Sequence, residues 1–232
     1  MRLRGAAKDG DMLALTAVKS SLDAQGWYRV DLGIVSERDL SFTLQNLTSE
    51  FGEPVAGRNR QLVERIVPSS QRAAQPASLS SKYGLADFPF HNDTAHWLIP
   101  CRYVFLACAN PGSVNVETWL LDVRSVPLST EEAQWLKRGI FFIRTGQKSF
   151  YSSIASNRRT FLRFDPGCME PMDEEARCAI RLFSPERVAQ YSERIDWNAG
   201  TIIAFDNWRV LHRRGPAVDG SSDRVLLRCS AA

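Results

Sequence analysis

The sequence predicts one domain in which many short β-strands close into a barrel or form two facing sheets, with a few helices around them. Short apolar runs bounded by turn residues dominate the chain after residue 100, whereas helical spacing is confined to a few segments. The 232 residues, 44% apolar and 24% charged, have the composition of an ordinary globular domain. Neither a repeat nor a linker divides the chain, so residues 1–232 are expected to form a single domain.

The N-terminal part is expected to contain two helices with a strand between them. Apolar residues recur at helical spacing over 14–23, and Gly26 ends this run. Residues 27–32 alternate between apolar and polar, as a half-buried strand does. The second helix is expected to begin at Ser36, a residue type that caps helix N-termini, and to end at Gly52.

Residues 68–84 are rich in Ser, Ala, Gln and Pro and have no periodicity. This composition predicts a long exposed loop. Because long loops in compact domains are often functional, we expect 68–84 to be a flexible loop that covers the active site.

The rest of the chain alternates strand-like runs with short helical insertions. Strands are expected at 101–108, 118–123, 139–144, 160–165, 200–206, 208–213 and 223–229. Helices are expected at 127–137, 173–183 and 185–192.

Charge and cysteine content exclude several classes of protein. The net charge of +3 is not gathered into a basic stripe, so no nucleic-acid partner is expected. No apolar run approaches the roughly 20 residues of a membrane span, and Asp9 and Asp11 interrupt the start of any secretory signal. The five cysteines contain no CxxC pair and are expected to be reduced, in a cytoplasmic protein. The sequence does not predict the oligomeric state.

Only three histidines are present, and two of them suggest a metal site. His91 and Asp93 are two residues apart, so in an extended segment both point to the same face. With His212 they would form the two-histidine, one-carboxylate arrangement of non-haem Fe(II) oxygenases. The simpler alternative is a turn in which Asp93 caps the backbone.

Two arginines in the last strand-like segment point to an anionic ligand. Arg224 and Arg228 lie on the same side as Leu226, and the flanking residues are apolar. An inward guanidinium requires an anion, and its planar fork suits a carboxylate. The alternatives are that either arginine pairs with a structural carboxylate such as Asp206, or reaches solvent at the end of the strand.

Four blocks carry a family resemblance: FPFHNDTAH, TWLLD, GTIIAFDNWRVLHRRGP and DRVLLRC. Together they resemble the Fe(II)/2-oxoglutarate-dependent dioxygenases of the taurine dioxygenase and clavaminate synthase-like group. The resemblance implies a mainly β fold with flanking helices, built on a double-stranded β-helix, the jelly roll of the cupin-like proteins. It extends from about residue 83 to residue 229.

The resemblance also implies roles for individual residues. His91, Asp93 and His212 would bind Fe(II). Arg224, twelve residues after His212, would hold the distal carboxylate of 2-oxoglutarate, and Thr118 would add a hydrogen bond to that carboxylate.

Arg228 matches a second arginine of the family, which contacts either the metal-side carboxylate of the cosubstrate or an anionic group of the substrate. Asp206 and Asn207 resemble supports of the turn before the distal histidine, whereas Trp208 departs from the family pattern.

The implied activity is oxidation of an unactivated C–H bond of a small molecule, such as an amino acid or a specialised metabolite. Dioxygen and 2-oxoglutarate would be the cosubstrates, and succinate and carbon dioxide would be released. The carboxylate of Asp93 favours hydroxylation, desaturation or cyclisation over halogenation, because related halogenases lack it.

Two other classes stay open at this point. A metal-dependent hydrolase or isomerase on a cupin-like barrel would use the same triad for zinc or manganese, but it has no evident need for Arg224 and Thr118. A non-catalytic binding protein with this fold would not need the intact triad.

Further side chains near these motifs are weaker candidates. His96 is expected to be packed, to face solvent or to contact the substrate. The aromatic residues that flank the motifs are core residues or pocket walls: Phe90, Trp97 and Trp119. Arg102 and Arg163 are expected to meet an anionic substrate or, more simply, to form exposed salt bridges.

Overall fold

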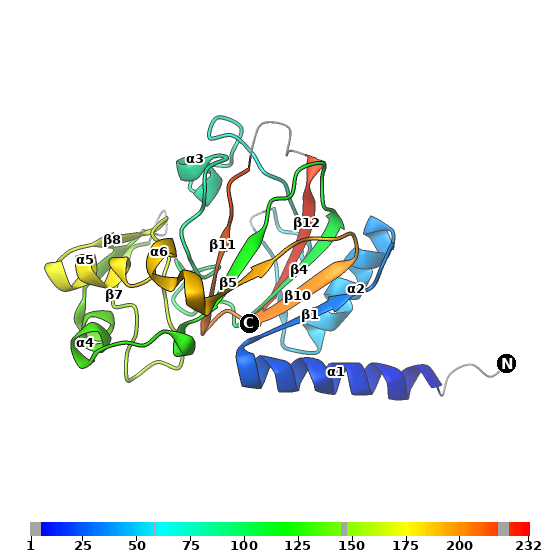
Figure 1. Ribbon diagram of the computed structural model, residues 1–232, viewed down its shortest axis with the longest axis horizontal. Helices are drawn as coiled ribbons and strands as arrows, with labels where there is room; N and C mark the ends of the chain where they lie inside the picture. The colour runs from blue at the N-terminus through cyan, green and yellow to red at the C-terminus, as the bar shows by residue number, and fades with distance from the viewer. Residues whose placement is uncertain (1–5, 58, 145–147, 218–222) are drawn as a thin grey trace.

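The computed structural model describes residues 6–57, 59–144, 148–217 and 223–232, without the side chains of 6–14. The strands of this part are β1 (Trp27–Asp31), β2 (Pro54–Val55), β3 (Glu64–Ile66), β4 (Tyr103–Asn110), β5 (Thr118–Asp122), β6 (Phe141–Ile143), β7 (Phe150–Ser152), β8 (Met169–Pro171), β9 (Ser192–Ile195), β10 (Thr201–Asp206), β11 (Val210–Arg214) and β12 (Val225–Ala231). Its α-helices are α1 (Ala6–Gln25), α2 (Glu37–Ser49), α3 (Leu79–Tyr83), α4 (Thr130–Arg138), α5 (Glu174–Arg181) and α6 (Pro185–Val188). Figure 1 shows their arrangement.

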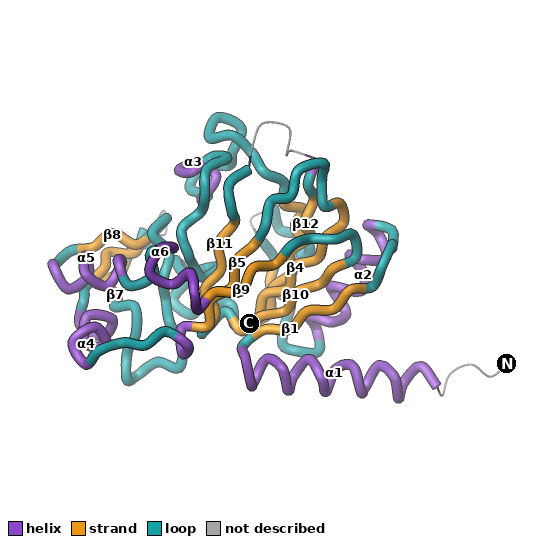
Figure 2. The backbone as a smooth tube through the Cα atoms, viewed as in Figure 1, coloured by secondary structure: helices purple, strands orange, loops and turns teal. Residues whose placement is uncertain are grey.

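Two antiparallel sheets form the centre of the molecule (Figure 2). The larger sheet has the order β1-β10-β4-β12-β2, and β3 also pairs with β12. The smaller sheet has the order β11-β5-β9. Strands β10 and β11 are consecutive but belong to different sheets, so the turn between them joins the two layers. This two-sheet architecture confirms the expected mainly β fold.

The core between the sheets follows from the alternation of side chains along each strand. On β4, Val104, Leu106 and Cys108 contribute to the cluster that also contains Leu120 of the smaller sheet. The intervening Phe105 belongs to a second cluster, on the opposite face of the larger sheet. Strand β4 is therefore buried on both faces, as its nearly continuous apolar run requires.

Helices α1 and α2 cover the outer face of the larger sheet. Val18 and Leu22 of α1 pack in the same cluster as Leu40 and Leu44 of α2, as their helical spacing predicts. Gly26 accepts a positive φ of 84° directly after α1, where an added Cβ would lie 2.7 Å from the Val210 side chain. This glycine lets the chain turn from the helix straight into β1.

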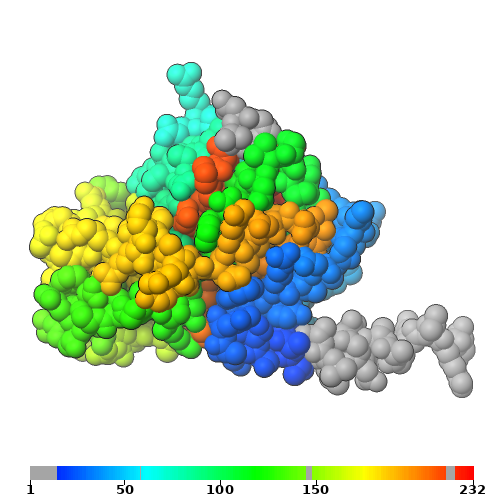
Figure 3. Space-filling model, viewed as in Figure 1, coloured from blue at the N-terminus to red at the C-terminus, as the bar shows by residue number. Residues whose placement is uncertain are grey.

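A separate lobe, formed by β6, β7 and β8 with helices α4, α5 and α6, packs beside the smaller sheet. Its cluster joins Phe141 and Ile143 of β6 to Leu121 and Leu211 of the smaller sheet. Figure 3 shows the green and yellow surface of this lobe at one end of the molecule. The lobe closes the outer face of the smaller sheet against water.

Two local predictions need correction. Residues 160–165 were expected to form a strand, but they form an irregular segment, in which Leu162 N donates to Trp208 O and Arg163 N to Ile154 O. Phe161 and Phe164 are buried, but the segment pairs with none of the described strands in a ladder. Within 68–84 the structure contains the short helix α3, so that segment is not a loop throughout. Its closure over the site stays a prediction.

No helix in the described part of the chain is long and apolar enough to cross a membrane.

Candidate metal and cosubstrate site

The two predicted histidine ligands are brought together by backbone pairing. His91 N donates to His212 O and His212 N donates to His91 O, both at 3.0 Å, which makes an isolated bridge at the edge of β11. The imidazole rings consequently lie with their centroids 4.2 Å apart. Residues that are 121 positions apart in the sequence thus share one small site.

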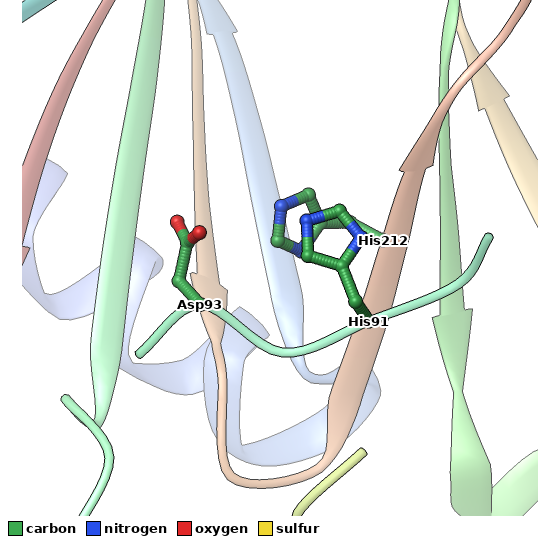
Figure 4. Close-up of side chains that lie close together, drawn as sticks. All are labelled: His91, Asp93 and His212. Atoms are coloured by element: carbon green, nitrogen blue, oxygen red, sulfur yellow. The ribbon is translucent and has the colours of Figure 1, made fainter. Parts of the chain in front are cut away.

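Asp93 completes the group, as its spacing from His91 predicts. One ligand atom of each of the three residues lies within 4.8 Å of those of the other two, and all three residues are buried. Figure 4 shows the carboxylate and both rings on the same side of the segment that carries His91 and Asp93. The structure therefore places the three predicted ligands together.

The hydrogen bonds of these side chains suit a metal. His91 Nδ1 lies 3.0 Å from Pro89 O, a contact in which Nδ1 is the protonated nitrogen and Nε2 keeps its lone pair. Within the described residues, His212 Nδ1 and Asp93 Oδ2 are buried without hydrogen-bond partners. Buried acceptors without donors are costly, and a bound cation would satisfy both. The donor set is that of a non-haem Fe(II) centre.

Arg228 of β12 pairs with the proposed carboxylate ligand. Its Nη1 lies 2.8 Å from Asp93 Oδ1, and its Nη2 lies 2.7 Å from Glu64 Oε2 on β3. Burial works to raise the pKa of Asp93, but the Arg228 charge and the neighbouring His212 and His91 lower it to about 2. Asp93 is therefore ionised at neutral pH and ready to bind a cation.

His212 is held neutral by its surroundings. Burial, together with the neighbouring His91, lowers the pKa of His212 to about 3, despite the opposing effect of Asp93. A neutral imidazole is the form that binds a metal.

Arg224 precedes β12 and is 2% exposed. Its Nη1 donates to Val116 O at 2.7 Å, and its Nε is buried without a partner in the described part of the chain. None of the ion pairs formed between described residues includes Arg224. Burial lowers its pKa to about 10, so it stays charged at neutral pH. A buried, unpaired guanidinium is suited to bind an external carboxylate.

Thr118 lies at the start of β5, two residues after the carbonyl that Arg224 contacts. It is buried, and its Oγ1 accepts a hydrogen bond of 3.0 Å from the indole Nε1 of Trp197. The hydroxyl proton of Thr118 remains available for a second acceptor. The position agrees with the predicted role of Thr118, which stays a prediction.

Sequence reasoning missed two residues of this region. Glu64 pairs with Arg228 across 164 positions of sequence, and nothing in its local pattern marks it. Arg214, two residues after His212, is 8% exposed, stacks 3.8 Å from the Phe88 ring centroid and donates to Gly84 O and Ala86 O. The sequence shows Arg214 next to Arg213, directly after His212, but short basic pairs of this kind usually lie in solvent.

The alternatives left open for the other charged residues are now resolved. Arg163 forms no exposed salt bridge: it is 1% exposed and donates from Nη2 to Leu98 O at 2.9 Å and from Nη1 to Trp97 O and Ala95 O. The side chain of Arg102 is 43% exposed and lies 3.8 Å from Asp206, which is the simpler of its two expected roles. Asp206 pairs with Arg102 and with neither Arg224 nor Arg228.

The weaker candidates have ordinary surroundings. Phe90 is buried in the cluster beneath the lobe, and Trp119 packs against that cluster. His96 is half-buried and meets the Trp97 ring edge-on, with centroids 6.1 Å apart.

Comparison with known proteins agrees with this geometry. Residues 127–230 match the sequence model of a family described as taurine catabolism dioxygenase TauD, TfdA family. This match covers the C-terminal part of the chain. The matched part contains His212, Arg224 and Arg228, and the resemblance expected from the sequence is confirmed.

Solved structures share the TauD-type fold over nearly the whole chain. An asparagine oxygenase in complex with Fe(II), 2S,3S-3-hydroxyasparagine and succinate superposes with a TM-score of 0.77 at 18% identity, covering 94% of this chain and 77% of its own. The non-heme iron oxygenase OrfP, in complex with Fe, succinate and (3S)-hydroxy-L-Arg, gives 0.70 at 18% identity, with 99% and 82% covered. A taurine dioxygenase from Burkholderia xenovorans gives 0.68 at 14% identity, with 100% and 83% covered. No curated protein matches the chain by sequence.

Proposed function

We propose that the protein is an Fe(II)/2-oxoglutarate-dependent dioxygenase that hydroxylates a free amino acid or a closely related small molecule. The observation that carries the proposal is the buried group of His91, Asp93 and His212, in which Asp93 Oδ2 and His212 Nδ1 lack a described partner. A bound Fe(II) would supply the oxidation chemistry with dioxygen, and the protein would supply binding, orientation and shielding from water.

His91, Asp93 and His212 would hold the Fe(II), and 2-oxoglutarate and dioxygen would be the cosubstrates of the reaction it supplies. Arg224, whose buried guanidinium forms no ion pair with a described residue, would bind the distal carboxylate of 2-oxoglutarate. Thr118 would add a hydrogen bond to the same carboxylate. A metal-dependent hydrolase has no equivalent use for a buried cation at this place.

The pair formed by Arg228 and Glu64 supports a zwitterionic substrate. The guanidinium lies 2.8 Å from Asp93 Oδ1, and Glu64 lies on its other side. Their side chains are 27% and 15% exposed, so a ligand can reach both. A substrate carboxylate would bind Arg228 and its ammonium group would bind Glu64. The hydroxylated amino acids bound by the asparagine oxygenase and by OrfP agree with this choice.

The first test is an anaerobic titration of metal-free protein with Fe(II) and then with 2-oxoglutarate, followed by visible absorption. We expect a weak charge-transfer band when both are present. The Arg224→Ala variant should need at least tenfold more 2-oxoglutarate to form it, because a charged hydrogen-bond partner is lost. Arg158→Ala is the control, since Arg158 is exposed and lies outside the proposed site.

No band, combined with tight binding of zinc, would contradict the proposal and favour the metal-dependent hydrolase. If the band forms, free amino acids are screened by succinate release. N-acetylated and amidated forms of each active compound are included. Both blocked forms should be poor substrates if Arg228 and Glu64 bind the two charged groups. Equal activity toward the blocked forms would rule out the zwitterion arrangement while leaving the dioxygenase assignment intact.

Two further expectations belong to this proposal. A small-molecule substrate, without nucleic acid as a partner, follows from the buried site and from the net charge of only +3. A cytoplasmic location stays a prediction from the cysteines, all five of which are free thiols.

A further inference from the structure

Two buried asparagines connect the segment that carries His91 and Asp93 to the turn that leads to His212. Asn92 is 1% exposed and Asn207 is 0% exposed. The two side chains act reciprocally, since each binds the backbone of the segment that carries the other. We call this pair of side chains the amide clamp.

The side chain of Asn207 pairs with the backbone of Asp93 as a neighbouring strand would. Its Oδ1 accepts from Asp93 N at 2.9 Å, and its Nδ2 donates to Asp93 O at 3.0 Å. The same Nδ2 donates to Cys101 O at 2.8 Å. Both peptide groups of the proposed carboxylate ligand are thereby held by one side chain from the β10–β11 turn.

Asn92 makes the opposite connection. Its Nδ2 donates to Asn207 O at 2.5 Å, and its Oδ1 accepts from Phe164 N at 2.8 Å. Its own backbone N donates to Phe164 O at 2.7 Å. Asn92, which lies between His91 and Asp93, is therefore bound both to the β10–β11 turn and to the irregular segment 160–165.

The backbone at Asp93 needs this support because no strand ladder among the described residues holds it. The pairing of His91 with His212 is an isolated bridge, and the chain turns immediately after Asp93. Thr94 has a φ of 55°, in the left-handed region that a β-branched residue rarely adopts. Such a conformation persists only where surrounding contacts impose it.

We propose that Asn92 and Asn207 are positioning residues of the metal centre, holding the backbone of Asp93 so that its carboxylate meets the two histidines. The inference rests on the proposed function, because it takes His91, Asp93 and His212 as the ligands. The clamp touches neither metal nor substrate and acts through the ligand backbone. Outer partners of metal ligands typically change metal affinity by 10- to 100-fold.

The test uses Co(II) alone as the probe, because its visible absorption reports the geometry of its ligands. The dissociation constant and the spectrum are measured for the wild type, Asn207→Ala and Asn92→Ala, well below each melting temperature. Thr48→Val is the matched control. It removes a buried hydrogen bond of 2.7 Å to Leu44 O within α2, which lies on the outer face of the larger sheet.

We expect Asn207→Ala to weaken Co(II) binding by about 10- to 100-fold and to alter the absorption spectrum. Asn92→Ala should weaken binding by about tenfold, and Thr48→Val should lower the melting temperature while leaving affinity and spectrum unchanged. If Asn207→Ala does not fold, Asn92→Ala decides the question.

If a folded Asn207→Ala or Asn92→Ala variant binds Co(II) with the affinity and spectrum of the wild type, the inference is overturned. The two asparagines would then contribute only to the stability of the fold. A wild-type protein that binds no Co(II) would instead overturn the proposed function, and this inference with it.

Discussion

Arg228 Nη1 lies 2.8 Å from Asp93 Oδ1, so the proposed carboxylate ligand carries a charge partner before any metal binds. This guanidinium also neutralises Glu64. A single side chain of β12 thereby links the proposed metal site to the proposed substrate site.

Replacing Arg228 with Gln should destabilise the metal-free protein, because it removes the cation that pairs with Asp93 and Glu64. We expect the free energy of unfolding at pH 7 to fall by about 2 to 4 kcal/mol, measured by urea denaturation. Burial then dominates and raises the pKa of Asp93 above its present value of about 2.

The loss of unfolding free energy in Arg228→Gln should depend on pH. A depressed carboxyl pKa contributes stability above the unfolded value of 3.8, and this contribution is lost as the pH falls toward 2. The difference between wild type and Arg228→Gln should therefore be largest near pH 7 and shrink on acidification. A difference that is constant from pH 7 to pH 3 would mean that the Asp93 charge is not involved.

Thr118 and Trp197 offer a double-mutant cycle at the proposed cosubstrate site. Thr118→Val leaves the buried indole Nε1 of Trp197 without its acceptor and should cost about 1 to 3 kcal/mol of stability. Adding Trp197→Phe removes the donor as well, so the double variant should lose less than the two single variants together. Additive losses in urea denaturation would show that the bond contributes little.

Arg163 should keep the backbone of the segment that follows Asp93 in a fixed conformation. Its guanidinium binds the carbonyls of Ala95, Trp97 and Leu98, and Leu98 and Ile99 next to them are 76% and 65% exposed. Arg163→Gln should make thermolysin cleave near Leu98 and Ile99 at least tenfold faster. Arg158→Gln, at an exposed position nearby in sequence, is the control and should leave cleavage unchanged.

The five free thiols should differ in reactivity. Burial raises the pKa of Cys101 and Cys108 to about 11, so roughly 0.1% of each is thiolate at pH 8. Cys178 on α5 is only partly buried. A disulfide reagent at pH 8 should label Cys178 first and the buried thiols only in denaturant. A rapid phase that survives Cys178→Ser would contradict this order.

The longer strands of the two sheets and the pairing of His91 with Asp93 were accessible from the sequence because both rest on short-range periodicity. The short strands β2, β3, β7, β8 and β9 were not predicted. The two-residue spacing of His91 and Asp93 sets their common face, and the apolar alternation of β4 and β10 sets the two sheets. The scarcity of histidines and the apolar surroundings of the last strand singled out His212 and Arg224. The likeness of four sequence blocks to a known family then implied their specific roles.

Long-range pairing explains what the sequence did not reveal. Glu64 meets Arg228 only because β3 pairs with β12, with Glu64 opposite Arg228 in the register, and no local signal encodes that register. Arg163 was misread because an arginine in an apolar run resembles a strand residue facing solvent. Its partners are backbone carbonyls of a distant segment, which a sequence pattern does not display.

Strand β12 lies inside the larger sheet, between β4 and the short strands β2 and β3. Among the described strands, β12 is therefore the one that connects β2 and β3 to the rest of the sheet. The same strand carries Arg228, which lies 2.8 Å from Asp93. A single strand thus joins the margin of the larger sheet to its centre and supplies the charge partner of the proposed metal ligand, so disruption of β12 would damage the sheet and the site together.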